Sequence, residues 1–163
     1  MKNEPVAAPV RQLATFVVGA QEYALDIMRI KEIINPLPIT AVPGAPGFME
    51  GVIELRGVIL PVVDLRKRFE LPATPLSRAS KYVLVTLDDK IVALIVDGVS
   101  EFLRKPPSDI RPTPSLIPGQ EARFFAGVCH HNGRILMLLD IDRVLTTQER
   151  ISLAGLGGEG ASS

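Results

Sequence analysis

The stretch GVIELRGVILPVVDLRKRF, residues 51–69, sets the architecture of this chain because its pattern returns further along. Residues 127–145, GVCHHNGRILMLLDIDRVL, repeat it 76 positions later without a gap, so that Gly51 aligns with Gly127. Each copy has an apolar run on either side of a central glycine, which predicts two strands joined by a tight turn. An internal repeat of this kind indicates a duplicated fold.

The predicted turn differs between the two copies. It contains Arg56-Gly57 in the first copy and Asn132-Gly133 in the second. Asn-Gly is suited to a type I′ turn, in which both central residues have positive φ. Arg56 is less suited to that conformation, so either Gly57 relieves most of the strain or the turn is of another type. Because stability would favour Asn, Asp or Gly there, we regard Arg56 as a candidate functional residue.

Each copy ends on an aspartate directly after its second apolar run, at Asp64 and at Asp140. A carboxylate in this position can accept hydrogen bonds from the free backbone amides of a following helical turn. We therefore interpret both aspartates as caps rather than catalytic residues. In the first copy the helical turn is expected over residues 65–69.

Several charged side chains near the predicted strands are expected at the surface. They are Glu32, Arg56 and the basic run Arg66, Lys67 and Arg68. Most charged side chains at a protein surface contribute little to the stability of the fold. However, the second copy has Asn132 in place of Arg56, and it has Asp142 in place of Arg66. A charge that changes between copies is not demanded by the architecture alone.

The upstream part of the chain is repeated as well. Residues 13–18 and 23–27 have the composition of two strands, and a shift of 69 positions places Phe16 on Val85. Several strands are apolar on both faces, so one face is expected to pack against the sister unit. Two such units of short antiparallel strands predict an all-β fold of two small barrels packed together.

The repeats also give expected boundaries. We expect one domain over residues 12–148, with a first barrel over about 12–78 and a second over about 80–148. Residues 1–11 are polar and contain prolines, and residues 149–163 end in a run rich in Gly and Ser. Both ends are expected to be flexible, the second one after a helical turn.

Composition limits the kinds of partner. The 163 residues include 18 basic and 18 acidic side chains, so the formal net charge is zero. Nucleic-acid and membrane surfaces normally demand a basic excess, which argues against either as the principal partner. No apolar run approaches the length of a membrane span. The N-terminus has no signal-peptide pattern, and the single Cys129 cannot form an intrachain disulfide, so we expect a cytoplasmic protein.

The chemistry-bearing residues are few. Cys129, His130 and His131 are adjacent in a predicted strand, so Cys129 and His131 share a face and His130 points the other way. A metal site needs three or four converging ligands, and here at most two converge. No nucleophile elbow, phosphate-binding glycine loop or paired carboxylates accompany them. We therefore expect no metal, no cofactor and no catalysis, and we place Cys129, which replaces Ile53 of the first copy, in the core.

At this point a family resemblance is recognisable. The segment ITAVPGAPGFMEGVIELRGVILPVVDLRKRF, residues 39–69, resembles the most characteristic part of the CheW-like adaptors of bacterial chemotaxis. Ile30-Lys31-Glu32-Ile33 and Phe125-Ala126-Gly127-Val128 also match, and the similarity runs from about Leu13 to Leu145. The family's Asn-Leu-Arg-Gly turn is Glu54-Leu55-Arg56-Gly57 in this chain, so its asparagine is replaced by glutamate.

The resemblance implies two SH3-like five-stranded barrels and a non-enzymatic adaptor. Members of the family couple transmembrane chemoreceptors to the histidine kinase CheA, at receptor arrays on the inner face of the membrane. One surface binds the regulatory domain of the kinase, and another binds the cytoplasmic hairpin tip of the receptor. The implied receptor-facing residues are Arg56, Glu32, Ile30, Glu54 and Gly57. The resemblance does not imply which residues contact the kinase. Because Glu54 replaces the family's asparagine, it is expected to influence which receptors this chain accepts.

Two alternatives differ in class from this one. The first is a CheW-like peptide-binding module in another chemosensory pathway, which neighbouring genes would distinguish. The second is a small enzyme that uses His130, His131 and Asp140, which a metal assay and alanine substitutions at both histidines would test.

Overall fold

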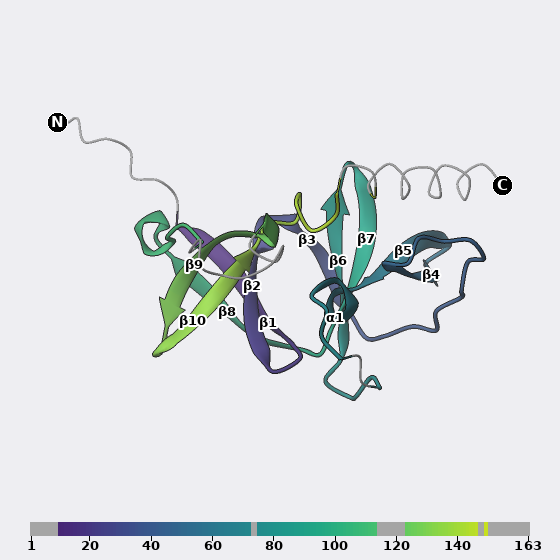
Figure 1. The fold of residues 1–163 in the computed structure, drawn as a ribbon, viewed down its shortest axis with the longest axis horizontal. Helices are drawn as coiled ribbons and strands as arrows, with labels where there is room; N and C mark the ends of the chain where they lie inside the picture. The colour runs from purple at the N-terminus through teal and green to yellow at the C-terminus, as the bar shows by residue number, and fades with distance from the viewer. Residues whose placement is uncertain (1–9, 73–74, 114–122, 147–148, 150–163) are drawn as a thin grey trace.

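The computed structural model describes residues 10–72, 75–113, 123–146 and 149. These residues form ten strands with three short helical turns, which confirms the predicted all-β fold (Figure 1). The strands are β1 (Arg11–Val18), β2 (Gln21–Asp26), β3 (Ile30–Ile34), β4 (Met49–Leu55), β5 (Val58–Asp64), β6 (Lys81–Leu87), β7 (Lys90–Val96), β8 (Gly98–Lys105), β9 (Phe125–His131) and β10 (Arg134–Leu139). The helical turns are η1 (Ile27–Arg29), α1 (Leu65–Arg68) and η2 (Pro107–Asp109).

The ends of the chain were predicted to be flexible. Most of that prediction falls on residues 1–9 and 150–163, which lie outside the described residues. Arg11, which was assigned to the tail, instead begins β1 and pairs with Lys105 of β8. The first strand therefore starts one residue before the expected domain boundary.

The strands form two five-stranded sheets. Sheet A has the order β8-β1-β2-β10-β9, and sheet B has the order β3-β6-β7-β5-β4. Figure 1 shows sheet A on the left and sheet B on the right. Neighbouring strands are antiparallel except for two parallel pairs, β2 with β10 and β5 with β7.

Each sheet contains strands from both halves of the chain, so the predicted division into barrels at residues 12–78 and 80–148 is wrong. The chain leaves sheet A after β2 to form β3, β4 and β5 in sheet B, and it returns to sheet A after β7. Equivalent strands of the two copies stand in the same order in both sheets, so an exchange of strands between copies leaves each strand with neighbours of the same kind. The sequence repeat therefore reveals which strands are equivalent but not which copy each one joins.

The predicted duplication itself is confirmed by the register. In sheet B, Gly51 pairs with Val62, and in sheet A, Gly127 pairs with Leu138, 76 positions later in both strands. Both glycines allow a close approach. An added Cβ would lie 2.3 Å from the carbonyl oxygen of Thr40 at Gly51 and 2.5 Å from that of Arg111 at Gly127. The repeat begins on glycine because no side chain fits there.

The described residues form three hydrophobic clusters. One lies within sheet B and includes Ile53 and Tyr82, and one lies within sheet A and includes Leu13 and Cys129. The third and largest joins both sheets, with Tyr23 of sheet A among its buried members. Cys129 is 1% exposed at the position equivalent to Ile53, which confirms its predicted place in the core. The shared third cluster makes the two barrel-like units one packed body.

Candidate functional site

The two hairpin turns have the same conformation despite their different sequences. Arg56 and Gly57 have φ angles of 52° and 82°, and Asn132 and Gly133 have 51° and 77°. Both central residues of each turn are thus in the left-handed region, as a type I′ turn requires. Arg56 itself therefore adopts a positive φ, which is uncommon for residues other than glycine. The glycine that follows it does not spare Arg56 this conformation.

Arg56 and Glu32 form a two-pronged ion pair. Arg56 Nη1 donates to Glu32 Oε1 over 2.9 Å, and Nη2 donates to Oε2 over 2.8 Å. The hydrogen bonds lower the pKa of Glu32 and raise the pKa of Arg56. The side chain of Arg56 is 68% exposed, and exposed pairs of this kind add little stability. The pair therefore orients the guanidinium at the surface rather than anchoring the fold.

This ion pair connects the two edge strands of sheet B, β3 and β4. Glu32 lies on β3 and Arg56 follows β4, and these strands stand at opposite ends of the strand order. The backbone also pairs here, between β4 and the segment that follows β3, because Thr40 and Val52 exchange two hydrogen bonds of 2.9 Å. These contacts bring the two edge strands of sheet B together, and the sheet curves into the barrel-like form expected from the sequence.

The other predicted site residues lie around this pair to differing degrees. Ile30, on β3, is half-buried and packs against the cluster shared by both sheets. Glu54, near the end of β4, is exposed. Gly57 forms the turn with open space around it. The structure thus brings Arg56 and Glu32 into contact, with Gly57 and Glu54 next to them and Ile30 partly inside.

Sequence reasoning missed two exposed apolar residues in the same hairpin. Val58 and Ile59 begin β5, and each is 54% exposed. Both faces of this strand were expected to be covered, but only its later part reaches the shared core, where Val63 is buried. The position of Val58 and Ile59 immediately after the turn is the signal that could have identified them.

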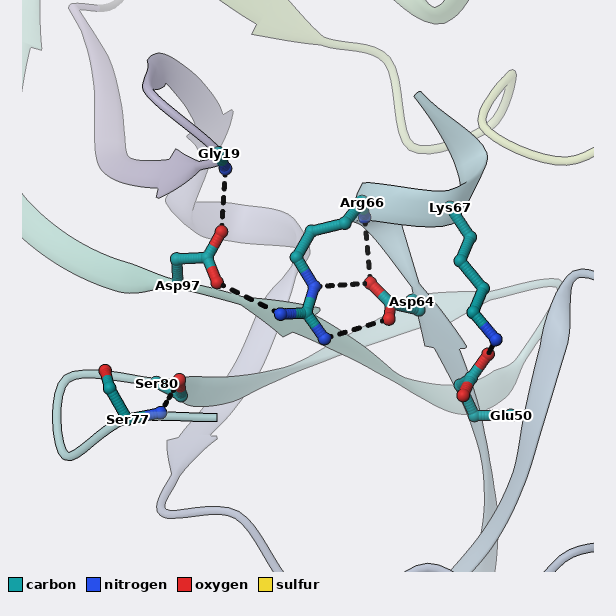
Figure 2. Close-up of polar contacts among 8 residues, drawn as sticks. All are labelled: Gly19, Glu50, Asp64, Arg66, Lys67, Ser77, Ser80 and Asp97. Carbon is teal, nitrogen blue, oxygen red and sulfur yellow. Dashed lines mark hydrogen bonds and ion pairs between the residues drawn. The ribbon is translucent and has the colours of Figure 1, made fainter. Parts of the chain in front are cut away.

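The basic run is not the exposed patch that the sequence suggested. The side chain of Arg66 is only 5% exposed, and its Nε and Nη2 each donate a hydrogen bond of 3.0 Å to the carboxylate of Asp64 (Figure 2). Lys67 pairs with Glu50 over 2.6 Å. Arg68 donates to the carbonyl oxygen of Val144 over 2.8 Å and contacts Glu149. All three basic side chains therefore have partners within the fold, with Arg66 buried and Lys67 still half exposed.

Arg66 links the two sheets. It follows β5 of sheet B, and its Nη1 lies 3.4 Å from Oδ1 of Asp97, in the connection between β7 and β8. The other carboxylate oxygen of Asp97 accepts a 2.7 Å hydrogen bond from the amide of Gly19, in the β1–β2 turn of sheet A (Figure 2). The network therefore crosses from one sheet to the other.

The second copy makes a related link with the charges exchanged. Asp142, at the position of Arg66, accepts two 2.9 Å hydrogen bonds from Arg29 of η1. Arg29 also donates to the carbonyl oxygen of Thr86 on β6, over 2.9 Å. Arg66 and Asp142 thus each have an oppositely charged partner within the fold, although that partner comes from a different position in each copy. At this one position the fold itself accounts for the charge in each copy, which corrects the interpretation that the architecture alone does not demand it.

The aspartates that end the repeats act as predicted. Asp64 Oδ1 accepts from the amide of Arg66 over 2.9 Å, and Asp140 Oδ1 accepts from the amide of Asp142 over 3.0 Å. Both are caps, and Asp140 is thereby occupied in a structural role.

The adjacent cysteine and histidines lie in β9. Cys129 is buried, which raises the pKa of its thiol. His131 Nε2 lies 3.6 Å from a carboxylate oxygen of Glu101, and His130 is exposed. Within the described part of the chain, no group of three or more His, Cys, Asp and Glu side chains could hold a metal ion. Nor does any helix there have the length and apolar character needed to cross a membrane.

Comparison with known proteins gives consistent matches over most of the chain. The CheW-like domain model matches residues 12–149. Chemotaxis protein CheW of Rhizobium meliloti is 36% identical over 140 residues, which cover 86% of this chain and 90% of the relative. Chemotaxis protein CheW of Treponema pallidum is 32% identical over 149 residues, which cover 89% and 88%.

A solved structure agrees with these matches. The crystal structure of scaffolding protein TtCheW from Thermoanaerobacter tengcongensis superposes with a TM-score of 0.78 at 28% identity, covering 87% of this chain and 96% of that one. Sequence and fold therefore point the same way, and the chain belongs to the CheW-like domain family.

Proposed function

We propose that this protein is a non-enzymatic adaptor of bacterial chemotaxis that couples transmembrane chemoreceptors to the histidine kinase CheA. Membership of the CheW-like family supports this role, as do relatives named chemotaxis protein CheW and a structural neighbour described as a scaffolding protein. The adaptor works in the cytoplasm, at receptor arrays on the inner face of the membrane. One surface takes the cytoplasmic hairpin tip of a receptor, and another takes the regulatory domain of the kinase.

The receptor-facing surface is the tip of the β4–β5 hairpin together with β3. The observation that carries this assignment is the state of Arg56. This long side chain has φ of 52° in a turn where Asn would fit better, yet Glu32 holds its exposed guanidinium in a defined direction. An oriented, accessible arginine with exposed Val58 and Ile59 beside it is typical of protein interfaces. Ile30, Glu54 and Gly57 complete the proposed surface.

The test substitutes Arg56→Ala. The free energy of unfolding should change by no more than about 0.5 kcal/mol, as at ordinary surface sites. Affinity for a soluble fragment of the receptor tip should fall about thirtyfold, equivalent to about 2 kcal/mol for a hot-spot arginine. Affinity for the kinase regulatory domain should be retained, because that partner uses a different surface.

The matched control is Arg134→Ala. Arg134 is also an exposed, ion-paired arginine beside a hairpin turn, but it belongs to the sister hairpin, where it contacts Glu22 and Glu101. This control should bind the receptor fragment as the parent does. Equal losses for both partners of the Arg56 variant would indicate misfolding, and an unchanged receptor affinity would remove Arg56 from the site.

A further inference from the structure

Among the residues that the structure describes, one charged side chain of the β4–β5 hairpin stands without an ionic partner. The hairpin, residues 49–64, carries Glu50, Glu54, Arg56 and Asp64. Glu50 pairs with Lys67, Arg56 pairs with Glu32, and Asp64 pairs with Arg66. Within the described ranges, Glu54 alone of these four has no ion pair or side-chain hydrogen bond. The described fold therefore leaves one negative charge uncompensated on this hairpin.

This carboxylate stands beside an exposed apolar residue. Glu54 lies directly across from Ile59 in the antiparallel pairing of β4 with β5, so their side chains project from the same face. Ile59 is 54% exposed. Aliphatic surface next to a free carboxylate complements a partner that offers an apolar side chain and a neighbouring cation. The Arg56–Glu32 pair at the tip adds no net charge, so it does not cancel this preference.

The sister hairpin does not repeat the arrangement. The residue equivalent to Glu54 is His130, and it lies across from Ile135, which is 52% exposed. The exposed isoleucine is thus common to both copies, whereas the carboxylate belongs to the first hairpin only. Neither the repeat nor a contact with another described residue accounts for the negative charge at Glu54.

We propose that Glu54 is a specificity-determining residue that selects receptor tips carrying a lysine or arginine opposite it, with Ile59 as the adjoining apolar contact. This inference rests on the proposed function, because it assigns a selective role within the receptor-facing surface. The partner is a helical hairpin tip with one exposed basic residue next to an apolar one. A tip with an acidic residue in that place is disfavoured by repulsion.

The experiment couples substitutions on both sides of the interface. The probe is a soluble cytoplasmic tip fragment of a chemoreceptor from the same genome, prepared as the parent sequence and as variants in which each exposed Lys or Arg is replaced in turn by Gln. Each fragment is titrated with the wild-type protein and with Glu54→Gln. One fragment variant should bind the wild type about threefold more weakly, as expected for an exposed ion pair. For Glu54→Gln that difference should vanish.

A charge reversal makes the test sharper. Glu54→Lys should weaken binding of the parent fragment by about tenfold, since repulsion replaces attraction. Changing the identified basic residue of the fragment to Glu should restore the binding. His130→Lys is the matched control on the sister hairpin and should leave all affinities unchanged. Because Glu54 and His130 are both exposed, the variants at these two positions should unfold at the same denaturant concentration as the parent.

The outcomes separate this inference from the proposed function. If the parent fragment binds but no fragment variant distinguishes the wild type from Glu54→Gln, the role of Glu54 is wrong and the adaptor function stands. The role of Glu54 is equally wrong if a tip without any basic residue binds just as well. If the wild type binds no receptor fragment at all, the proposed function fails and the inference fails with it.

Discussion

The two copies of the repeat share a backbone and place different side chains on it. At the β4–β5 tip, Arg56 holds Glu32 of β3. At the β9–β10 tip, the equivalent acid is Glu101 of β8, and it lies 3.6 Å from both His131 Nε2 and Arg134 Nη2. The acid thus stays in place while its cationic partner comes from a different position of the hairpin. The fold fixes where a carboxylate stands, and the surrounding surface chemistry varies.

The links between the sheets differ in another way. Both link one sheet to the other, but the side chain of Arg66 is 5% exposed, whereas that of Arg29 is 33% exposed and that of its partner Asp142 is 53% exposed. An ion pair shielded from water depends strongly on both partners, while an exposed one contributes little. The same architectural role therefore carries unequal energetic weight in the two copies.

The largest expected effect tests this inequality. Arg66→Met keeps much of the side-chain volume but leaves Asp64, which is 2% exposed, as a buried carboxylate without its cation. Urea unfolding should show a loss of about 3–5 kcal/mol. Arg29→Met, the matched change in the exposed link, should cost no more than about 1 kcal/mol. Equal losses at both positions would mean that burial does not govern these links.

A second, smaller effect compares the glycines that begin the two repeats. Gly51→Ala and Gly127→Ala each introduce a Cβ against a backbone carbonyl, which should cost about 1–3 kcal/mol in unfolding experiments. Gly51 should be the worse site because it also has φ of 148°, a region that L residues rarely adopt. A Gly127→Ala loss that exceeds the Gly51→Ala loss would contradict this interpretation of the backbone.

The smallest effect concerns the two turns. Arg56→Asn places an asparagine at φ of 52°, where it is favoured, and Asn132→Arg places an arginine at 51°. The first change should raise the free energy of unfolding and the second should lower it, each by a few tenths of a kcal/mol, and the thermal unfolding midpoint should move in the same direction. Opposite signs are the diagnostic result. If both variants lose stability equally, the Arg56–Glu32 pair contributes more to folding than its exposure suggests.

Much of the fold followed from local patterns. The two hairpins, the caps at Asp64 and Asp140 and the buried Cys129 were predicted correctly, because each depends on residues close in sequence or on an apolar pattern. The type of the Arg56-Gly57 turn was left open by the sequence, and the structure shows that Arg56 itself takes the positive φ. The site was anticipated in part: Arg56 and Glu32 were named through the family resemblance, and the structure brings them into contact. Their role in receptor binding remains a prediction.

Contacts between distant residues were beyond such reasoning. Arg66 was expected at the surface because basic residues usually are, but it is buried, and its guanidinium reaches Asp97, in a connection between the two sheets. Likewise, the strong pattern of each strand could not show whether it joins its own copy or the other. Hydrophobic periodicity and turn chemistry are properties of the chain segment. Strand pairing and the removal of water from a charged group depend on the segment that packs against them, which can be far away in sequence. For this reason only the tertiary structure decided the exchange of strands, the burial of Arg66 and the uncompensated charge of Glu54 among the described residues.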